Sequence, residues 1–330
     1  MKEHKRILFL SMNNDGSTYY RMSLVSDTLK KLGYDSSHAL EFNDDYMVVN
    51  VDNKVVSLYS FDIIFFQTIT HSWLFGMINK LKRKGITIIL NIDDDYLNDA
   101  GYGSFYMPKD KKDTVRKALE YADNICVSTP ELSDLYGKHR CKVIENCVDT
   151  SLYNTKKIKH DKFTIGWFGT VTHLYDLNII GGCIPDDVRL VIAGFPEALP
   201  KYFSNVKDTK GIGLFNIKEL PTIISEIDLG LVPLIDNKFN QGKSDLKGVE
   251  FGAGHVPVIA SNVAPYKRWV ENGVNGYLAN NSKDFIKHIN RCINNTSLMD
   301  YLSINARDKA LLRDINIGIN NYIEYYNFVK

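Results

Sequence analysis

The feature that most constrains the fold is an alternation of short apolar runs with helix-like segments, which occurs twice along the chain. In the first half, the runs Arg6–Met12, Asp62–Gln67 and Ile86–Asn91 predict buried strands with helical segments between them. The alternation stops at Asn146–Asp161 and restarts with a strand at Phe163–Phe168. A strand–helix–strand series predicts a parallel sheet covered by helices on both faces. We therefore expect an α/β protein with two Rossmann-like halves.

The same reading places the other elements. Further strands are expected at Asp35–Leu40, Asn124–Ser128, Lys142–Glu145, Val188–Ala193, Leu229–Pro233 and Val256–Ala260. Further helices are expected near Tyr19–Leu32, Ser72–Lys84, Lys111–Tyr121, Leu174–Ile180, Ile217–Ile227, Ser282–Asn294, Ser297–Leu312 and Ile315–Val329. Val48–Val51 and Val55–Tyr59 read as a hairpin inserted into the parallel pattern. Neither half carries a complete G-x-G-x-x-G motif, which disfavours a dinucleotide oxidoreductase.

Composition limits the classes of partner. The net charge is +1, so the chain has no global basic field for nucleic acid or anionic membrane. The 5 cysteines form no C-x-x-C pair, and we expect free thiols in a reducing compartment. Ile7–Leu10 is too short for the apolar core of a signal peptide, and no run approaches the ~18 residues of a transmembrane helix. A cytoplasmic protein is expected, with peripheral attachment to the inner membrane face left open.

A candidate site lies in residues 240–261. Lys243, Lys247 and Glu250 are spaced so that a helix beginning near Lys243 would show all three on one face. A helix N-terminus with two lysines attracts phosphate, and a carboxylate two turns further on suits sugar hydroxyls. This arrangement predicts a nucleotide-sugar site, with the diphosphate at the helix start and the ribose at Glu250. On spacing alone, a solvated helix face fits equally well.

The segment resembles the donor-binding signature of GT-B glycosyltransferases, in the large retaining family that includes sucrose synthases and bacterial mannosyltransferases. That family usually reads Glu, seven residues, Glu, a small-residue turn and a Pro-Val-Val-Ala-Ser-like strand. Glu250 matches the second glutamate, and Gly254 through Ser261 match the turn and strand. Gly242 stands where the first glutamate is expected. In the family that glutamate lies near the donor sugar, so its replacement is a clear departure.

The resemblance also implies a domain plan. Residues 1–150 would form an N-terminal acceptor-binding domain and residues 151–312 a C-terminal donor-binding domain, the two facing a central cleft. Residues 313–330 would be a helix returning to the N-terminal domain. Asn146 to Asp149 resemble the Asn-Gly-Val-Asp that often joins the two GT-B domains.

Gly166 to Thr170, followed by Thr172 and His173, resembles the family's first donor-domain loop, where backbone N–H groups meet the donor diphosphate. Many members have a basic pair after this loop, and its absence here leaves the charge to Lys243 and Lys247. Candidate donor-binding residues are Gly169, Thr170, His173, Asn240, Ser244 and Glu250.

Candidates in the first half lie where strands meet the following segment, the edge at which open α/β sheets bind ligands. Gly16 and Ser17 precede the first helix, and Arg21 is expected to reach the cleft as a fixed positive charge. The alternative is a plain loop with a surface arginine. His71 follows the strand Asp62–Gln67, and many GT-B enzymes place a histidine near the donor sugar. A lone histidine is more often structural.

Three aspartates, Asp93 to Asp95, follow the strand Ile86–Asn91. Such a cluster holds a divalent ion in metal-dependent GT-A glycosyltransferases. Here it lies in the first half, far in sequence from the donor signature, and the GT-B plan normally needs no metal. We expect Asp94 to contact the acceptor or shape the cleft, and we expect no metal or other cofactor; an acidic loop at the rim is the alternative.

The predicted reaction is glycosyl transfer from a UDP- or GDP-linked sugar. The resemblance implies retention of anomeric configuration, with Lys243, Lys247 and the Gly169–Thr170 amides stabilising the departing diphosphate and His71 near the sugar. The expected acceptor is a surface glycan or lipid-linked sugar. A phage-type DNA glycosyltransferase acting on hydroxymethylated bases stays open because of a basic stripe, Lys80, Lys82, Arg83 and Lys84. A non-catalytic nucleotide-sugar-binding protein stays open because of Gly242.

Overall fold

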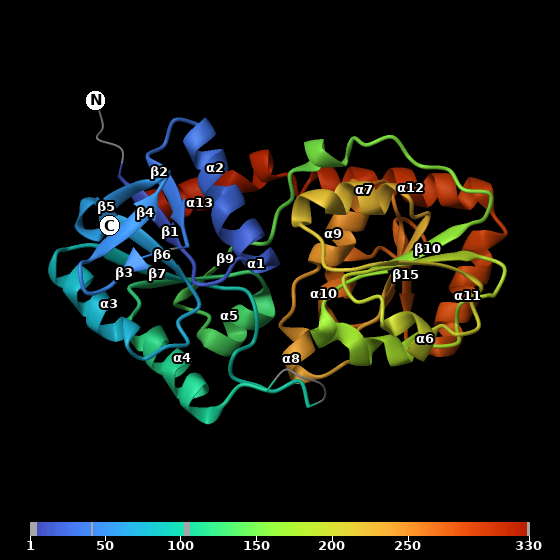
Figure 1. Cartoon of the computed structure of the whole chain (residues 1–330), viewed down its shortest axis with the longest axis horizontal. Helices are drawn as coiled ribbons and strands as arrows, with labels where there is room; N and C mark the ends of the chain where they lie inside the picture. The colour runs from blue at the N-terminus through green and yellow to red at the C-terminus, as the bar shows by residue number, and fades with distance from the viewer. Residues whose placement is uncertain (1–4, 41, 102–105, 329–330) are drawn as a thin grey trace.

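The computed structural model describes residues 5–40, 42–101 and 106–328, which form two α/β domains side by side (Figure 1). The first domain is built on a sheet of 6 parallel strands in the order β2-β1-β6-β7-β8-β9. Its strands are β1 (Ile7–Leu10), β2 (Ser36–Ala39), β6 (Ile63–Gln67), β7 (Thr87–Ile92), β8 (Asn124–Val127) and β9 (Cys141–Val143). The central strands are apolar and buried because helices cover both faces.

The helical segments of this domain are α1 (Gly16–Thr18), a π-helical turn (Tyr19–Ser23), α2 (Leu24–Lys31), a 3-10 turn (Leu58–Ser60), α3 (Leu74–Arg83), α4 (Lys109–Tyr121) and α5 (Pro130–Tyr136). The sequence reading missed α5. Its signal was Thr129-Pro130, because the Thr129 hydroxyl accepts a hydrogen bond from Leu132 N and a proline occupies the first turn.

The predicted hairpin is confirmed as β4 (Val48–Val51) and β5 (Lys54–Ser57), and β3 (Phe42–Asn43) adds a third antiparallel strand. Asp52 and Asn53 form its two-residue turn at φ of 49° and 62°, the backbone conformation that hairpin turns of this length require.

The second domain repeats the plan with 6 parallel strands in the order β12-β11-β10-β13-β14-β15. They are β10 (Thr164–Phe168), β11 (Arg189–Ala193), β12 (Asp208–Ile212), β13 (Leu229–Val232), β14 (Val258–Ser261) and β15 (Gly276–Ala279). Around them lie 3-10 turns at Thr150–Tyr153, Val171–Ile179 and Ile217–Glu219, and helices α6 (Ala198–Tyr202), α7 (Leu220–Ser225), α8 (Lys238–Gln241), α9 (Leu246–Ala253), α10 (Ala264–Trp269), α11 (Ser282–Ile293) and α12 (Thr296–Leu311). Both domains are therefore Rossmann-like, as predicted.

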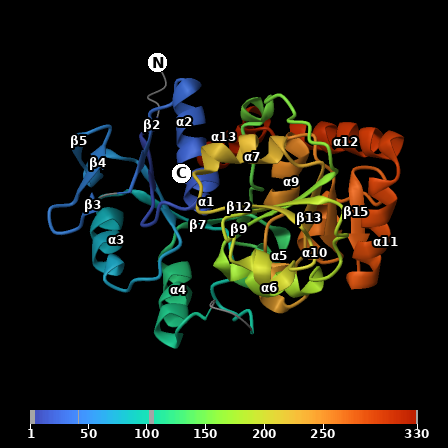
Figure 2. The same cartoon turned by 45° about the vertical axis from the view of Figure 1, so that its right-hand side comes forward.

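The last helix, α13 (Ile315–Phe328), returns to the first domain, which confirms the predicted crossing (Figures 1 and 2). The Tyr325 hydroxyl donates to the Ile125 carbonyl at 3.1 Å, and the ring of Tyr326 meets Tyr34 edge-on. Tyr322 packs on Phe65 in the sheet. Val329, the last residue of the predicted range, lies outside the described residues.

Two other expectations concern the chain as a whole. All 5 cysteines are free thiols, as predicted. Within the described ranges, no helix combines the length and apolar character that crossing a membrane requires.

The two domains meet at the carboxyl ends of their strands, where loops of one contact loops of the other. The Thr129 hydroxyl donates to the Gly242 carbonyl at 3.0 Å, and the Asn237 amide donates to the Ala100 carbonyl at 2.9 Å. Arg268 and Glu131 form an ion pair across the same interface. This network holds the two domains together over the edge where open α/β sheets bind ligands.

Candidate active site between the two domains

The loop after β10 is shaped by a close approach between two backbones. Gly169 N donates to the Ala193 carbonyl at 3.0 Å, which brings the loop against the end of β11. Gly194 has a φ of +95°, and a Cβ there would lie 2.1 Å from the Gly169 carbonyl oxygen. Only glycine fits on both counts. Gly194 is a site residue that the sequence reading missed, and a glycine directly after a buried strand was the available signal.

Lys247 lies directly against this loop. A Cβ on Gly169 would be 3.1 Å from Lys247 Nζ, and the ammonium group sits 5.5 Å from the centre of the Trp167 ring. Burial lowers the pKa of Lys247 to about 8. The structure thus brings Gly169 and Lys247 together, as the sequence predicted, around a partly desolvated cation.

His173 is neutral in this arrangement. Burial, and then the charge of Lys247, lower the pKa of His173 to about 3. Its Nδ1 lies 3.0 Å from Oδ2 of Asp176, a fully buried carboxylate that accepts, so Nδ1 carries the proton and Nε2 is left as an acceptor. Asp176 also accepts from Ile235 N at 2.9 Å. His173 and Asp176 therefore join the loop after β10 to the loop after β13, and His173 adds no positive charge.

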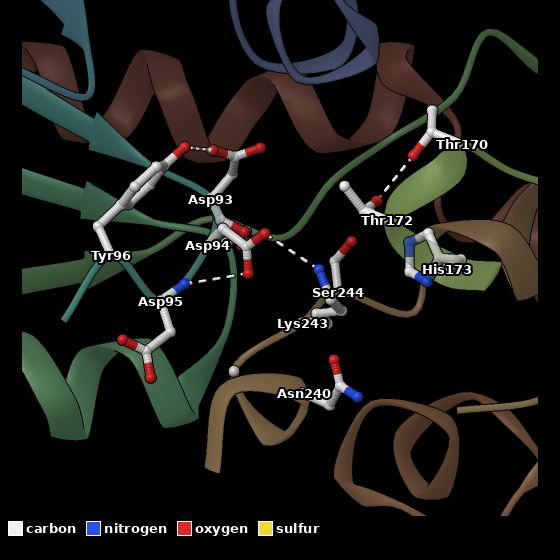
Figure 3. Close-up of polar contacts among 12 residues, drawn as sticks. Asp93, Asp94, Asp95, Tyr96, Thr170, Thr172, His173, Asn240, Lys243 and Ser244 are labelled. Carbon is white, nitrogen blue, oxygen red and sulfur yellow. Dashed lines mark hydrogen bonds and ion pairs between the residues drawn. The ribbon is translucent and has the colours of Figure 1, made fainter. Parts of the chain in front are cut away.

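Lys243 does not begin a helix, so the single predicted face of Lys243, Lys247 and Glu250 is wrong. The helix α9 starts at Leu246, and Lys243 lies in the segment between α8 and α9. Its Nζ is 3.0 Å from Asp94 Oδ2 of the other domain (Figure 3). The same Nζ is 4.4 Å from the Phe239 ring centre. Gly242 caps the end of α8 and Asp245 caps the start of α9, so Lys243 lies in the short connection between the two helices and is not part of α9.

Glu250 is on α9 but is already engaged. It is 3% exposed, and its carboxylate accepts a hydrogen bond from the Tyr20 hydroxyl of the first domain. Tyr20 also shares a side-chain hydrogen bond with Tyr153. Burial raises the pKa of Glu250 to about 7. The Tyr20 hydroxyl thus occupies one of the two carboxylate oxygens to which a ribose hydroxyl would bind.

Two other donor-binding candidates have partners within the protein. Asn240 is 1% exposed, and its amide donates to the Ile235 carbonyl at 2.8 Å, so it braces the loop instead of projecting from it. That corrects its expected role as a ligand. The Ser244 hydroxyl accepts from the Asn146 amide at 3.1 Å and so faces the interface. Thr170 is exposed and shares a 2.8 Å hydrogen bond with Thr172 (Figure 3).

The three adjacent aspartates do three different things (Figure 3). Asp93 meets the Tyr96 hydroxyl, and burial raises its pKa. Asp94 reaches across to Lys243. Asp95 accepts from the backbone N–H groups of Leu97 and Asn98 at 2.8 and 2.9 Å, which fixes the following turn. In the described part of the chain, no three His, Cys, Asp or Glu side chains are grouped in the manner of a metal site.

The remaining candidates lie at the carboxyl edge of the first sheet. Gly16 opens α1 and is exposed, with open space where a side chain would be, and Ser17 hydrogen-bonds Asp93. His71 follows β6 and meets the Thr70 hydroxyl at 3.1 Å. No described contact joins His71 to the second domain.

Arg21 does not reach the interface, which corrects its predicted role. It is 1% exposed, and its guanidinium donates to Asn91 Oδ1 and to the Ile144 carbonyl. The ring centre of Tyr322, on α13, lies 5.8 Å from the guanidinium carbon of Arg21. The π-helical turn that contains Arg21 points it into the domain, where it ties the sheet to the interdomain linker.

Arg21→Met should therefore destabilise the fold. The substitution keeps most of the volume but leaves the Asn91 and Ile144 oxygens without this buried donor, at a cost of about 1–3 kcal/mol. Urea unfolding of both proteins measures the difference. A stability equal to wild type, with activity lost, would instead support the cleft role expected from the sequence.

Comparison with known proteins bears on this geometry. Residues 177–295, a stretch shorter than half of the chain, match the family model described as "Glycosyl transferases group 1". No curated protein gave a significant sequence match.

Solved structures match along almost the whole chain. Anabaena HepE, crystallised with UDP and glucose, is 16% identical with a TM-score of 0.69 over 98% of this chain and 100% of its own. A glycosyltransferase from Rickettsia africae is 13% identical with a TM-score of 0.72 over 99% of both chains. Sucrose-phosphate synthase from Thermosynechococcus elongatus is 13% identical with a TM-score of 0.72 over 98% of both.

The architecture is thus that of the GT-B glycosyltransferases, with two Rossmann-like domains and a returning C-terminal helix. The match to the group 1 glycosyl transferase model lies within its second domain.

Proposed function

We propose that this protein is a glycosyltransferase that moves a sugar from a UDP- or GDP-linked donor to an acceptor hydroxyl. The observation that carries the proposal is the position of Lys247, a partly desolvated ammonium group against the Gly169 loop. Lys243 lies on the adjoining segment and adds a second cation. The family match over residues 177–295 and the UDP complex of Anabaena HepE support the same reading.

In the proposed reaction, negative charge grows on the diphosphate as its bond to the anomeric carbon breaks. Fixed cations and N–H groups aimed at those oxygens stabilise the transition state, and they act more strongly in a desolvated site than in water. Lys247, Lys243 and the Thr170 N–H group take this role. The Gly169 N–H, which the family resemblance assigned to the diphosphate, is used by the Ala193 carbonyl, so Gly169 shapes the loop instead. Glu250 would hold the ribose. We propose retention of configuration by same-face attack, as the family resemblance implies, with no residue assigned as a nucleophile.

We further propose that the lysines, and not a divalent ion, neutralise the diphosphate. Asp94 pairs with Lys243 and Asp95 caps backbone N–H groups, so these carboxylates already have partners. We place the protein in the cytoplasm, because its 5 free thiols suit a reducing compartment.

For the acceptor, we propose a surface glycan or a lipid-linked sugar. The DNA alternative relied on a basic stripe at the mouth of the site, and the stripe is elsewhere. It occupies the last turn of α3, which leads into the amino end of β7, whereas the site is at the carboxyl ends of the strands. Lys82 there pairs with Asp123 at 2.8 Å. These residues fit a solvated helix end.

A panel of UDP- and GDP-sugars tests the proposal. Thermal shift identifies the donor, because a ligand at 100 times its Kd stabilises the fold by about 2.7 kcal/mol. Slow hydrolysis of that donor, followed in excess EDTA, should persist. Binding without hydrolysis or transfer would favour the non-catalytic binding protein. Activity lost in EDTA and restored by manganese would refute metal independence.

A further inference from the structure

We propose that Asp94, on the first domain, is the carboxylate that binds the donor sugar, in place of the side chain that position 242 of the second domain lacks. The inference rests on the proposed glycosyltransferase function and deepens it. It assigns the sugar-binding acid to the opposite domain, so that the donor site is complete only when the two domains are in contact.

A side chain at position 242 would press directly against the first domain in this arrangement. Gly242 is buried at the interface, and a Cβ there would lie 2.9 Å from Leu132 Cδ2 and 3.6 Å from Asp95 Cβ, both on the first domain. The Gly242 carbonyl accepts from the Thr129 hydroxyl at 3.0 Å, which fixes this approach. A side chain at position 242 would therefore require the Leu132 side chain to shift.

The surface of the first domain that packs on Gly242 presents its own carboxylate beside it. Asp94 precedes Asp95, and its Oδ2 is 3.0 Å from Nζ of Lys243, the residue after Gly242. Two hydrogen bonds hold Asp94 in place: its Oδ1 accepts from Asp95 N at 3.0 Å, and its carbonyl accepts from the Tyr136 hydroxyl at 2.9 Å. The side chain is 23% exposed, so it is ordered yet accessible to a ligand.

The other two aspartates do not compete for this role. Asp93 is engaged by Tyr96 and Ser17 within its own domain. Asp95 is 2% exposed and is used by the backbone N–H groups that follow it. Among these three, Asp94 is the one whose carboxylate reaches the second domain.

The chemistry matches a sugar hydroxyl donor. In a nucleotide-sugar the hexose is attached directly to the distal phosphate, so an acceptor group within hydrogen-bond distance of a phosphate-binding lysine is within reach of the hexose hydroxyls. An ionised carboxylate is the strongest acceptor available for them, and it also holds Lys243 in place. The same pair therefore orients both the cation and the sugar.

Asp94→Asn tests this with UDP and UDP-glucose as probes, and GDP and GDP-mannose as the second pair. Asparagine keeps an acceptor for Asp95 N but removes the charge. Calorimetry should show UDP affinity within about twofold of wild type or tighter, since Lys243 loses a competitor. The ratio of UDP-glucose affinity to UDP affinity, or the turnover of UDP-glucose, should fall about tenfold or more. Asp134→Asn, an exposed carboxylate on α5, is the matched control and should change neither.

Equal losses of UDP and UDP-glucose affinity would overturn the inference, because they would mean that Asp94 only holds the domains together. Unchanged values for both would overturn it as well. If the wild-type protein binds UDP-glucose, neither of these two results contradicts the proposed function. A wild type that binds neither UDP-glucose nor GDP-mannose would reject the proposed function, and this inference with it.

A rescue variant gives independent support. Gly242→Glu added to Asp94→Asn returns a carboxylate from the second domain, and Leu132→Ala makes room for it. The triple variant should recover part of the glucose-dependent affinity relative to Asp94→Asn with Leu132→Ala. Retained UDP binding shows that each variant is folded. No recovery in a folded triple variant would count against a sugar-binding carboxylate at this place.

Discussion

Lys247→Met is expected to lower kcat/KM for sugar transfer by about 100- to 1000-fold, the usual cost of removing one preorganised group from a developing oxyanion. Lys247 lies against the Gly169 loop, and the Trp167 ring packs beside it. Because these groups surround the ammonium position, water does not easily enter to stabilise the diphosphate once the ammonium group is removed. Methionine keeps the length and the apolar contact with Trp167. Steady-state kinetics on the donor found in the panel measure the loss.

Two further observations make this test specific. Lys238→Met, on the exposed side of the preceding helix α8, is the matched control and should leave kcat/KM unchanged. Because burial lowers the pKa of Lys247 to about 8, wild-type kcat/KM should fall as pH rises through about 8, and this fall should vanish in Lys247→Met. A loss smaller than threefold would remove Lys247 from the diphosphate site.

Glu250→Gln is expected to stabilise the protein near neutral pH and above. Burial raises the pKa of Glu250 from 4.5 to about 7, so between these values the folded state holds a proton that the unfolded state has released. Stability therefore falls as pH rises through this window, by up to about 3 kcal/mol at 1.36 kcal/mol for each unit of pKa. Glutamine cannot ionise and removes this loss.

Thermal unfolding of wild type and Glu250→Gln between pH 4 and pH 8 measures how the difference in their stabilities depends on pH. The difference is needed because His173, present in both proteins, changes the stability with pH in the opposite direction. Its pKa is lowered to about 3, so its contribution to stability rises with pH up to about 6.5. Tyr20→Phe removes a hydrogen bond that lowers the pKa of Glu250, so it should move the window to higher pH. A pH-independent difference between Glu250→Gln and wild type would show that Glu250 does not titrate there.

The sequence predicted the two parallel sheets well, because their central strands are continuous apolar runs between helical segments. It missed the edge strands β12 and β15. Asp208–Ile212 alternates exposed and half-buried residues and so does not resemble a buried strand. Gly276–Ala279 is mostly buried, but it begins with a glycine and lies between Asn275 and Asn280, a pattern that is typical of a loop. Edge strands of this kind depend on pairing with a neighbour, which a local pattern does not record.

In the candidate site, sequence spacing identified the residues but not which neighbours their side chains contact. The spacing was consistent with a helix from Lys243, yet the helix begins at Leu246, and the Gly242 carbonyl that precedes Lys243 accepts from the Thr129 hydroxyl of the other domain. Arg21 and Tyr20 are adjacent, and the π-helical turn sends one into the core and the other to Glu250. Contacts between residues this far apart in sequence carry no periodic signal.

The returning helix α13 has a consequence for the order in which the protein acquires its structure during synthesis. The second domain is one continuous stretch of chain that is complete before the helix α13 begins. The first domain lacks the layer formed by Ile319, Tyr322 and Tyr325 until that helix has left the ribosome, although its sheet is made much earlier. Domains generally fold as units, beginning from the N-terminus during synthesis. Here the domain translated first is the one completed last, and until then the surface that α13 will cover stays open to water or to a chaperone.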